Sequence, residues 1–320
     1  MNWNTLDTWI VITAGLVAMA CVLPGVFLLL SRQSMVAHGI AHAVLPGIVL
    51  GHLATGGVET PALLTGAVFA GILCAVLTRF LQNFSGVDSG AALGISFTTL
   101  FALGLILQRL LADHVHIEPS HVLYGNLETA IFDVIISGTP FPAAAQRALG
   151  AFLLNLLFVF LLYKELVITT FDPHHGDTVG ARPRMSYYLL MAISALTCVI
   201  AFEAVGSILV VAMMIIPPAI ASLFTNDIKK LILSSLLIAL ACTVAGHILS
   251  LGALGNNIAR LLGFQEVGST NTAAGIVLVS SLCFVLSSLG RKYLKRAPAP
   301  PEPLPTISPI LNDKLSLIHI

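Results

Sequence analysis

The chain has 320 residues, of which 57% are hydrophobic and only 9% are charged. Soluble globular domains carry about 25% charged residues, so this composition excludes an ordinary soluble fold. The 15 Lys and Arg residues balance the 15 Asp and Glu residues, which leaves no basic excess for binding a nucleic acid. The apolar runs are long and continuous, so we expect an all-α, polytopic transmembrane helical bundle.

Apolar stretches long enough to span a bilayer predict about nine spans, or eight at the fewest. In chain order they cover residues 9–30, 34–53, 61–81, 91–111, 142–163, 186–203, 205–224, 231–251 and 273–290. The longest segments between them are 112–141 and 164–185. We expect residues 1–296 to form the transmembrane domain and the Pro-rich residues 297–320 to be a disordered tail.

The basic residues predict how the bundle is oriented. Nine spans put the two termini on opposite sides of the membrane. If the C-terminus is inside, twelve Lys and Arg residues fall on the inner side, and the outer side holds only Arg109, Arg147 and Arg260. By the positive-inside rule, the N-terminus is predicted to be outside and the C-terminus to be cytoplasmic.

The second span carries the most informative residues, His38 and His42 followed by Pro46-Gly47. The spacing of four puts both imidazoles on one helix face, and Pro46-Gly47 predicts a helix break near mid-membrane. Polar residues at this depth usually line a pathway, so the pair indicates a divalent-metal site. Two histidines hydrogen-bonded to neighbouring helices are the alternative. An HExxH protease is opposed, because Gly39 stands where its general-base Glu would be.

Other intramembrane and outer residues are weaker candidates. Glu203, at the outer end of the sixth span, is either a gate residue that supports a metal site or an interfacial carboxylate that faces water. His247, in the eighth span, is typical of a packing histidine. Pro217-Pro218 predicts another helix break, in the seventh span. The outer segment carries a cluster that either receives a metal or is simply solvated, formed by His114, His116, Glu118 and His121.

The inner segment has the pattern of a short helix. Asp172-Pro173 is a good N-cap and first turn, and Gly180 is a good C-terminal residue. A helix held between two spans suits docking on a cytoplasmic motor, with an ordinary interfacial loop as the alternative. The sequence has no Gly-Lys pair and hence no P-loop, so a transporter built from it must draw energy from an ion gradient or a partner.

Five motifs in chain order resemble the metal-ion permeases of bacterial ABC importers, the family that takes up zinc, manganese and iron. They are AHGIAHAVLPG at 37–47, VDSG at 87–90, SHVLYGN at 120–126, the stretch from Phe171-Asp172-Pro173 to Gly180, and AVGSILVVAMMIIP at 204–217. Together they extend over nearly the whole chain.

The resemblance implies a fold of the ABC importer permease type, in a multi-pass subunit of the bacterial inner membrane that is not an enzyme. No permanently bound cofactor is expected, since the divalent metal ion is the substrate. The implied partners are a second permease copy or paralogue, a cytoplasmic ABC ATPase docked on the segment from Phe171 to Gly180, and an extracytoplasmic metal-binding protein.

The resemblance also implies roles for the two histidines of the second span. His42 matches the histidine thought to line the family's metal path, whereas His38 stands where the family has Asp. Carboxylate oxygen suits Mn²⁺ and a second imidazole suits Zn²⁺ or Fe²⁺, while VLYGN leans toward the manganese and iron branch. We therefore expect a permease for Mn²⁺ or Zn²⁺, with Fe²⁺ as a further option. A gradient-driven divalent-metal carrier without an ATPase is the alternative.

Overall fold

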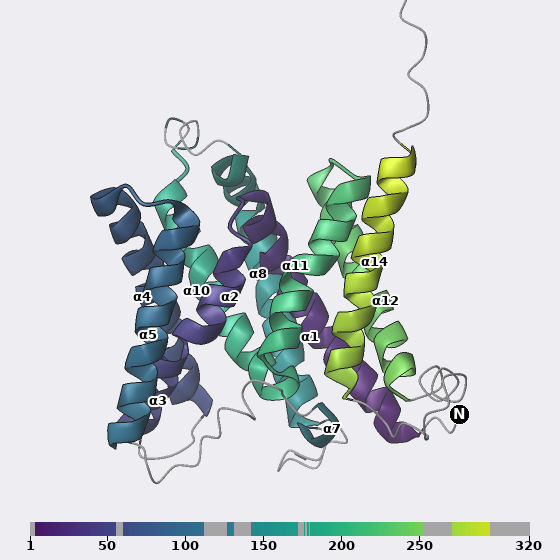
Figure 1. The fold of residues 1–320 in the computed structure, drawn as a ribbon, viewed down its shortest axis with the longest axis horizontal. Helices are drawn as coiled ribbons and strands as arrows, with labels where there is room; N and C mark the ends of the chain where they lie inside the picture. The colour runs from purple at the N-terminus through teal and green to yellow at the C-terminus, as the bar shows by residue number, and fades with distance from the viewer. Residues whose placement is uncertain are drawn as a thin grey trace, which may run out of the picture.

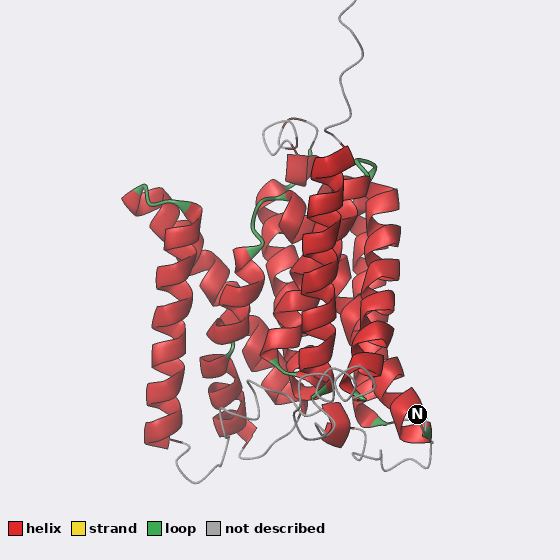
Figure 2. Cartoon of the chain, turned by 45° about the vertical axis from the view of Figure 1, so that its right-hand side comes forward, coloured by secondary structure: helices red, strands yellow, loops and turns green. Residues whose placement is uncertain are grey.

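The computed structural model describes residues 4–55, 60–111, 127–130, 142–171, 176, 178, 180–251 and 271–294. All the regular elements in these ranges are α-helices (Figure 2). Eight of these helices are long and apolar enough to cross a membrane. They are α1 (Thr5–Leu30), α4 (Thr60–Ser85), α5 (Ser89–Leu111), α8 (Ala143–Phe171), α10 (Pro183–Val205), α11 (Ser207–Phe224), α12 (Ile228–Ser250) and α14 (Thr272–Leu294).

The remaining predicted span, 34–53, consists of two shorter helices, α2 (Met35–Ala43) and α3 (Leu45–Thr55). The short helix α7 (Leu127–Ala130) precedes α8. The prediction of an all-α bundle with eight to nine spans is therefore confirmed. The inner segment is shorter than the predicted 164–185, because α8 continues through Lys164 and Glu165 to Phe171. The length of an apolar run reflects the thickness of the bilayer, and the helix itself can continue past the end of that run into polar residues.

Helix α1 lies at the centre of the bundle and packs against α8, α10, α11 and α12. Helices α11, α12 and α14 pack together on the right of Figure 1, and α3, α4 and α5 pack together on the left. Helix α10 connects the two groups, since it contacts α4 of one group and α11 of the other. The start of α1 and the end of α14 lie at opposite ends of the bundle (Figure 1).

A buried proline in α1 creates a polar link between three helices. Pro24 has no N–H, so the carbonyl of Ala20 lacks its usual donor four residues later. The side chain of Asn155 in α8 donates to this carbonyl instead, with an N···O distance of 2.8 Å. Asn155 Nδ2 also lies 2.8 Å from Oγ1 of Thr197 in α10. Asn155 therefore holds α1, α8 and α10 together in the apolar core.

The predicted break at Pro217-Pro218 is wrong, because α11 continues through both buried prolines. The two prolines leave the carbonyls of Met213 and Met214 without their donors four residues later. The Met214 carbonyl packs so closely against Gly25 of α1 that a Cβ on this glycine would overlap it. Tight packing against a neighbour explains why the helix continues, since prolines are tolerated in membrane helices where neighbouring helices compensate.

Candidate metal site

The break in the second predicted span lies next to Pro46, as the sequence predicts. Helix α2 ends at Ala43, and Pro46 lies in the first turn of α3, where proline is tolerated. Because Pro46 has no N–H, the carbonyl of His42 loses the donor that an unbroken helix would provide. The break therefore leaves the backbone oxygen of His42 without its helical donor.

Close packing holds the broken segment in place. Pro46 lies against Gly104 of α5, where a Cβ would approach its ring to 2.9 Å. Gly47 meets Gly66 of α4 so closely that a Cβ on either residue would overlap the carbonyl of the other. Gly47 thus brings α3 against α4, while Pro46 provides the break.

The two imidazoles lie together on the same face of α2. The ring centroids of His38 and His42 are 4.8 Å apart, and the ring planes are inclined by 81°. Two imidazoles that bind one tetrahedral ion through bonds of about 2.1 Å have centroids roughly 5 Å apart. The separation of the two rings therefore suits a pair of ligands to one metal ion.

Two phenylalanines of α5 flank the pair. Phe97 is stacked with His42 at a centroid distance of 6.1 Å and meets His38 edge-on at 5.8 Å. Phe101 meets His42 edge-on at 5.5 Å. Gly39, between the two histidines, allows α5 to come this close, because a Cβ there would lie 3.0 Å from Leu93. The rings of α5 thus support both imidazoles from one side.

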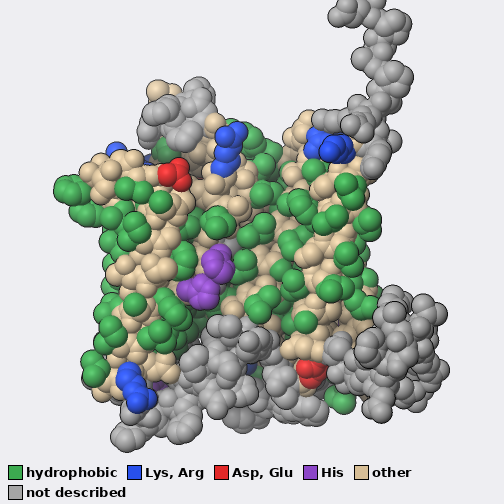
Figure 3. Space-filling view, in the orientation of Figure 1, with side chains coloured by type: hydrophobic (Ala, Val, Ile, Leu, Met, Phe, Trp, Pro, Cys, Tyr) green, Lys and Arg blue, Asp and Glu red, His purple; other side chains and the backbone are tan. Residues whose placement is uncertain are grey.

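The other side of the pair is open. The side chain of His38 is exposed and that of His42 is half-buried. Figure 3 shows the main patch of histidine side chains at mid-height on the face where α2 lies, surrounded by hydrophobic side chains. Among the described residues, no three His, Cys, Asp or Glu side chains gather to hold a metal ion. One chain therefore provides two imidazole ligands at this face.

Several predicted site residues lie outside the described part of the structure, namely Asp172, Pro173, His114, His116, Glu118 and His121. Glu203 lies in α10, but its side chain is also outside the described part. Phe171 ends α8 with 60% of its surface exposed. Gly176 and Thr178 are helical, and Gly180 has a φ of +86°, which favours glycine.

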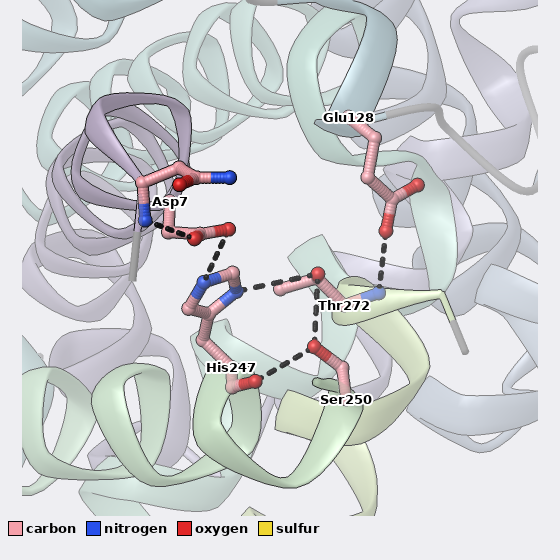
Figure 4. A network of polar contacts seen from close by, with 6 residues as sticks. Asp7, Glu128, His247, Ser250 and Thr272 are labelled. Carbon is pink, nitrogen blue, oxygen red and sulfur yellow. Dashed lines mark hydrogen bonds and ion pairs between the residues drawn. The ribbon is translucent and has the colours of Figure 1, made fainter. Parts of the chain in front are cut away.

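His247 belongs to a polar network at one end of the bundle (Figure 4). Its Nδ1 lies 3.4 Å from Thr272 Oγ1 and its Nε2 lies 3.6 Å from Asp7 Oδ1. The backbone N–H of Thr272 donates to Glu128 Oε1 at 3.0 Å, and the Thr272 hydroxyl lies 3.1 Å from that of Ser250. This network joins α1, α7, α12 and α14, so the expectation of a packing histidine agrees with its contacts.

Sequence reasoning missed Phe97 and Phe101, as well as Asp7, Glu128 and Thr272 of the network. The phenylalanines lie in an apolar run, where nothing distinguishes an aromatic beside a metal site from one in the core. Glu128 and Thr272 are 144 residues apart in the chain, so no local pattern relates them. The one available signal was an acidic residue, Asp7, in the first turn of α1. Its carboxylate accepts a hydrogen bond of 2.8 Å from the Asn4 N–H and so caps the helix.

A multi-pass helical bundle with two imidazoles beside a mid-membrane helix break is the architecture of a membrane transport protein. The chain belongs to the ABC 3 transport family, whose sequence model matches residues 5–291. This match covers the described bundle from the start of α1 almost to the end of α14.

Characterised proteins and a solved structure are similar to the chain. It is 36% identical to the manganese transport system membrane protein MntD of Bacillus subtilis (strain 168), over 76% of this chain and 83% of that protein. It is 39% identical to the zinc transport system membrane protein TroD of Treponema pallidum (strain Nichols), over 65% of this chain and 57% of that protein. The fold matches a chain of PsaBC from Streptococcus pneumoniae, solved in complex with Fab, with a TM-score of 0.69 and 27% identity, over 91% of this chain and 95% of that chain.

Proposed function

We propose that this chain is the permease subunit of a binding-protein-dependent ABC importer that carries Mn²⁺ or Zn²⁺, with Fe²⁺ as a further option, across a bacterial inner membrane. The observation that carries the proposal is the His38–His42 pair beside the Pro46 break. Membership of the ABC 3 transport family and the manganese and zinc relatives support this class of substrate. ATP hydrolysis belongs to a separate subunit, so the chain itself is a permease and not an enzyme.

A second permease copy or a paralogue covers the histidine pair in this proposal. An exposed imidazole in hydrocarbon is unfavourable, so the face that carries His38 needs a polar or protein neighbour. One chain provides only two imidazoles at this face, and four-coordinate metals need two further ligands. A partner related by approximate two-fold symmetry would bring an equivalent pair to the same ion.

The segment from Phe171 to Gly180 docks on the cytoplasmic ATPase in this proposal. The exposed Phe171 ring at the end of α8 gives such a contact an apolar anchor. The positive-inside rule supports a cytoplasmic position for this end of the bundle and for the C-terminus, with the N-terminus outside. An extracytoplasmic protein then delivers the metal at the opposite end, where His114, His116, Glu118 and His121 form a receiving cluster and Glu203 supports the gate.

Uptake of metal into proteoliposomes that contain the complete complex tests this function. His42→Ala should abolish ATP-driven uptake of Mn²⁺ and Zn²⁺ while the complex stays assembled. His52→Ala, a matched change in α3 of the same broken span, should leave uptake near the wild-type level. Normal uptake by the His42→Ala complex would refute the assignment of the pathway. Uptake that needs no ATPase would instead indicate a gradient-driven carrier.

A further inference from the structure

A second polar site lies at the end of the bundle opposite the His247 network. A cavity of about 150 Å³ opens there where α1 and α8 end and α10 begins. Its lining includes Ser31, Gln33, Arg79, Thr170, Ser186 and Tyr187, and we call it the Arg79 cavity. At about 30 Å³ per water molecule, it has room for a group of the size of a phosphate.

Arg79 of α4 gives this cavity a positive charge. The guanidinium carbon lies 4.3 Å from the centroid of the Tyr187 ring, which is a cation–π geometry. Within the described part of the chain, no acidic side chain pairs with Arg79. A guanidinium has five N–H donors, so the donors that do not reach the Tyr187 hydroxyl stay available along its edge. The cavity is therefore suited to an anion with several acceptor oxygens.

Gln33 indicates that the ligand also carries a hydrogen-bond donor. The turn after α1 has hydrogen bonds from the Gln33 N–H to the Leu28 carbonyl, 2.8 Å, and from the Arg32 N–H to the Leu29 carbonyl, 3.0 Å. This Schellman pattern fixes the position of Gln33 at the end of the helix. The side-chain Oε1 of Gln33 is buried and has no hydrogen-bond partner. A ligand that also carries an N–H or O–H donor would satisfy this oxygen.

The cavity lies near one end of the membrane-spanning helices. Arg79 lies six residues before the end of α4 at Ser85, which is about 9 Å along the helix axis. A long basic side chain near a helix end directs its charge toward the membrane interface. Basic pockets between helices on the cytoplasmic side are suited to binding lipid headgroups.

We propose that the Arg79 cavity binds a phosphate group that also carries a hydrogen-bond donor, supplied by the headgroup of a membrane phospholipid. Phosphatidylethanolamine and phosphatidylglycerol have such donors, an ammonium and hydroxyls, whereas phosphatidylcholine has none. The phosphate accepts from the Arg79 guanidinium, and the donor satisfies Gln33 Oε1. The bound headgroup then holds α4 against the ends of α8 and α10, which flank the 172–182 segment.

Native mass spectrometry of the delipidated full-length chain tests this site, after addition of each lipid or of inorganic phosphate. Wild type should retain one phosphatidylethanolamine or phosphatidylglycerol at least about tenfold better than phosphatidylcholine, as expected for one satisfied hydrogen bond to a charged group. Arg79→Gln should lower this retention about tenfold or more. Arg291→Gln, a matched change at the same end of α14, should behave as wild type.

Gln33→Leu separates the two parts of the proposal, and it keeps the test open if Arg79→Gln does not fold. This variant should still bind phosphate-bearing lipids but lose the preference over phosphatidylcholine. Equal retention by the Arg79→Gln and Arg291→Gln variants would overturn the site. Binding of inorganic phosphate without retention of any lipid would overturn the lipid source and leave a site for soluble phosphate.

Discussion

At the scale of single residues, we expect His38 to be the position that sets the substrate preference. It shares a helix face with His42 at a centroid distance of 4.8 Å, and it occupies the position where the resembling permeases have Asp. Manganese prefers oxygen ligands, whereas imidazole suits zinc and iron. The chemistry of one side chain therefore changes the preference without moving the helix that carries it.

His38→Asp should retain uptake with the preference shifted toward Mn²⁺, because a carboxylate replaces an imidazole. His38→Ala should lower uptake of all metals by about tenfold or more, since it removes one of the two side-chain ligands. Competition between Mn²⁺ and Zn²⁺ during uptake by the complete complex measures both effects. An unchanged order of preference in the His38→Asp variant would show that His38 does not contact the ion.

At the scale of helices, Pro46 has a different role from that of the other buried prolines. The carbonyl freed by Pro24 receives a side-chain donor, and that of Met214 packs against Gly25. The carbonyl freed by Pro46 belongs to His42, one of the two candidate ligands. The missing N–H of proline thus affects helix packing in α1 and α11, and we expect it to affect the proposed metal pathway between α2 and α3.

Pro46→Ala should restore the hydrogen bond from residue 46 to the His42 carbonyl and make α2 and α3 one helix. We expect the thermal stability of the detergent-solubilised chain to stay level or rise, while metal uptake falls several-fold. Pro217→Ala, in a helix that is already continuous, should not reduce uptake. Unaltered uptake in the Pro46→Ala variant would mean that the break has no part in transport.

The link between Pro24 and Asn155 can be measured as a coupling energy. Asn155→Leu should lower the free energy of unfolding by about 1–3 kcal/mol, because the Ala20 carbonyl is left buried without a donor. Adding Pro24→Ala restores a backbone donor to that carbonyl, so the double variant should lose less than Asn155→Leu alone. Unfolding by denaturant for all four chains gives the double-mutant cycle. Additive effects would contradict the link.

At the scale of the whole molecule, the sequence predicts the spans and the histidine pair well, because both rest on local patterns. An apolar run of about twenty residues must become a helix in a bilayer, and a spacing of four places two side chains on one helix face. What it misses depends on contacts between distant segments. Helix α11 continues through Pro217 because it packs against α1. Gly206 joins α10 to α11 with a φ of +78°, and no local sequence pattern indicates that this glycine needs a positive φ.

The two ends of the bundle are built differently, which bears on where selectivity arises. The His247 network lies at the end that is predicted to face outward, and the Arg79 cavity lies at the predicted inner end. The histidine pair lies between them, held by α2 and supported by Phe97 and Phe101 of α5. A pair fixed on a helix discriminates between metals more sharply than ligands on a long segment, since its geometry is set in advance.

A triple variant with Gln in place of His114, His116 and His121 tests where metal selectivity arises. It distinguishes the outer cluster from the His38–His42 pair within the membrane. We expect a lower transport rate when metal is scarce, because neutral imidazoles at the entrance help to capture it. The order of metal preference should stay unchanged, because the His38–His42 pair sets it. Uptake measured across a range of Mn²⁺ and Zn²⁺ concentrations separates these effects. If the triple variant reverses the preference and the His38→Asp variant does not, the selective step lies on the outer side of the membrane.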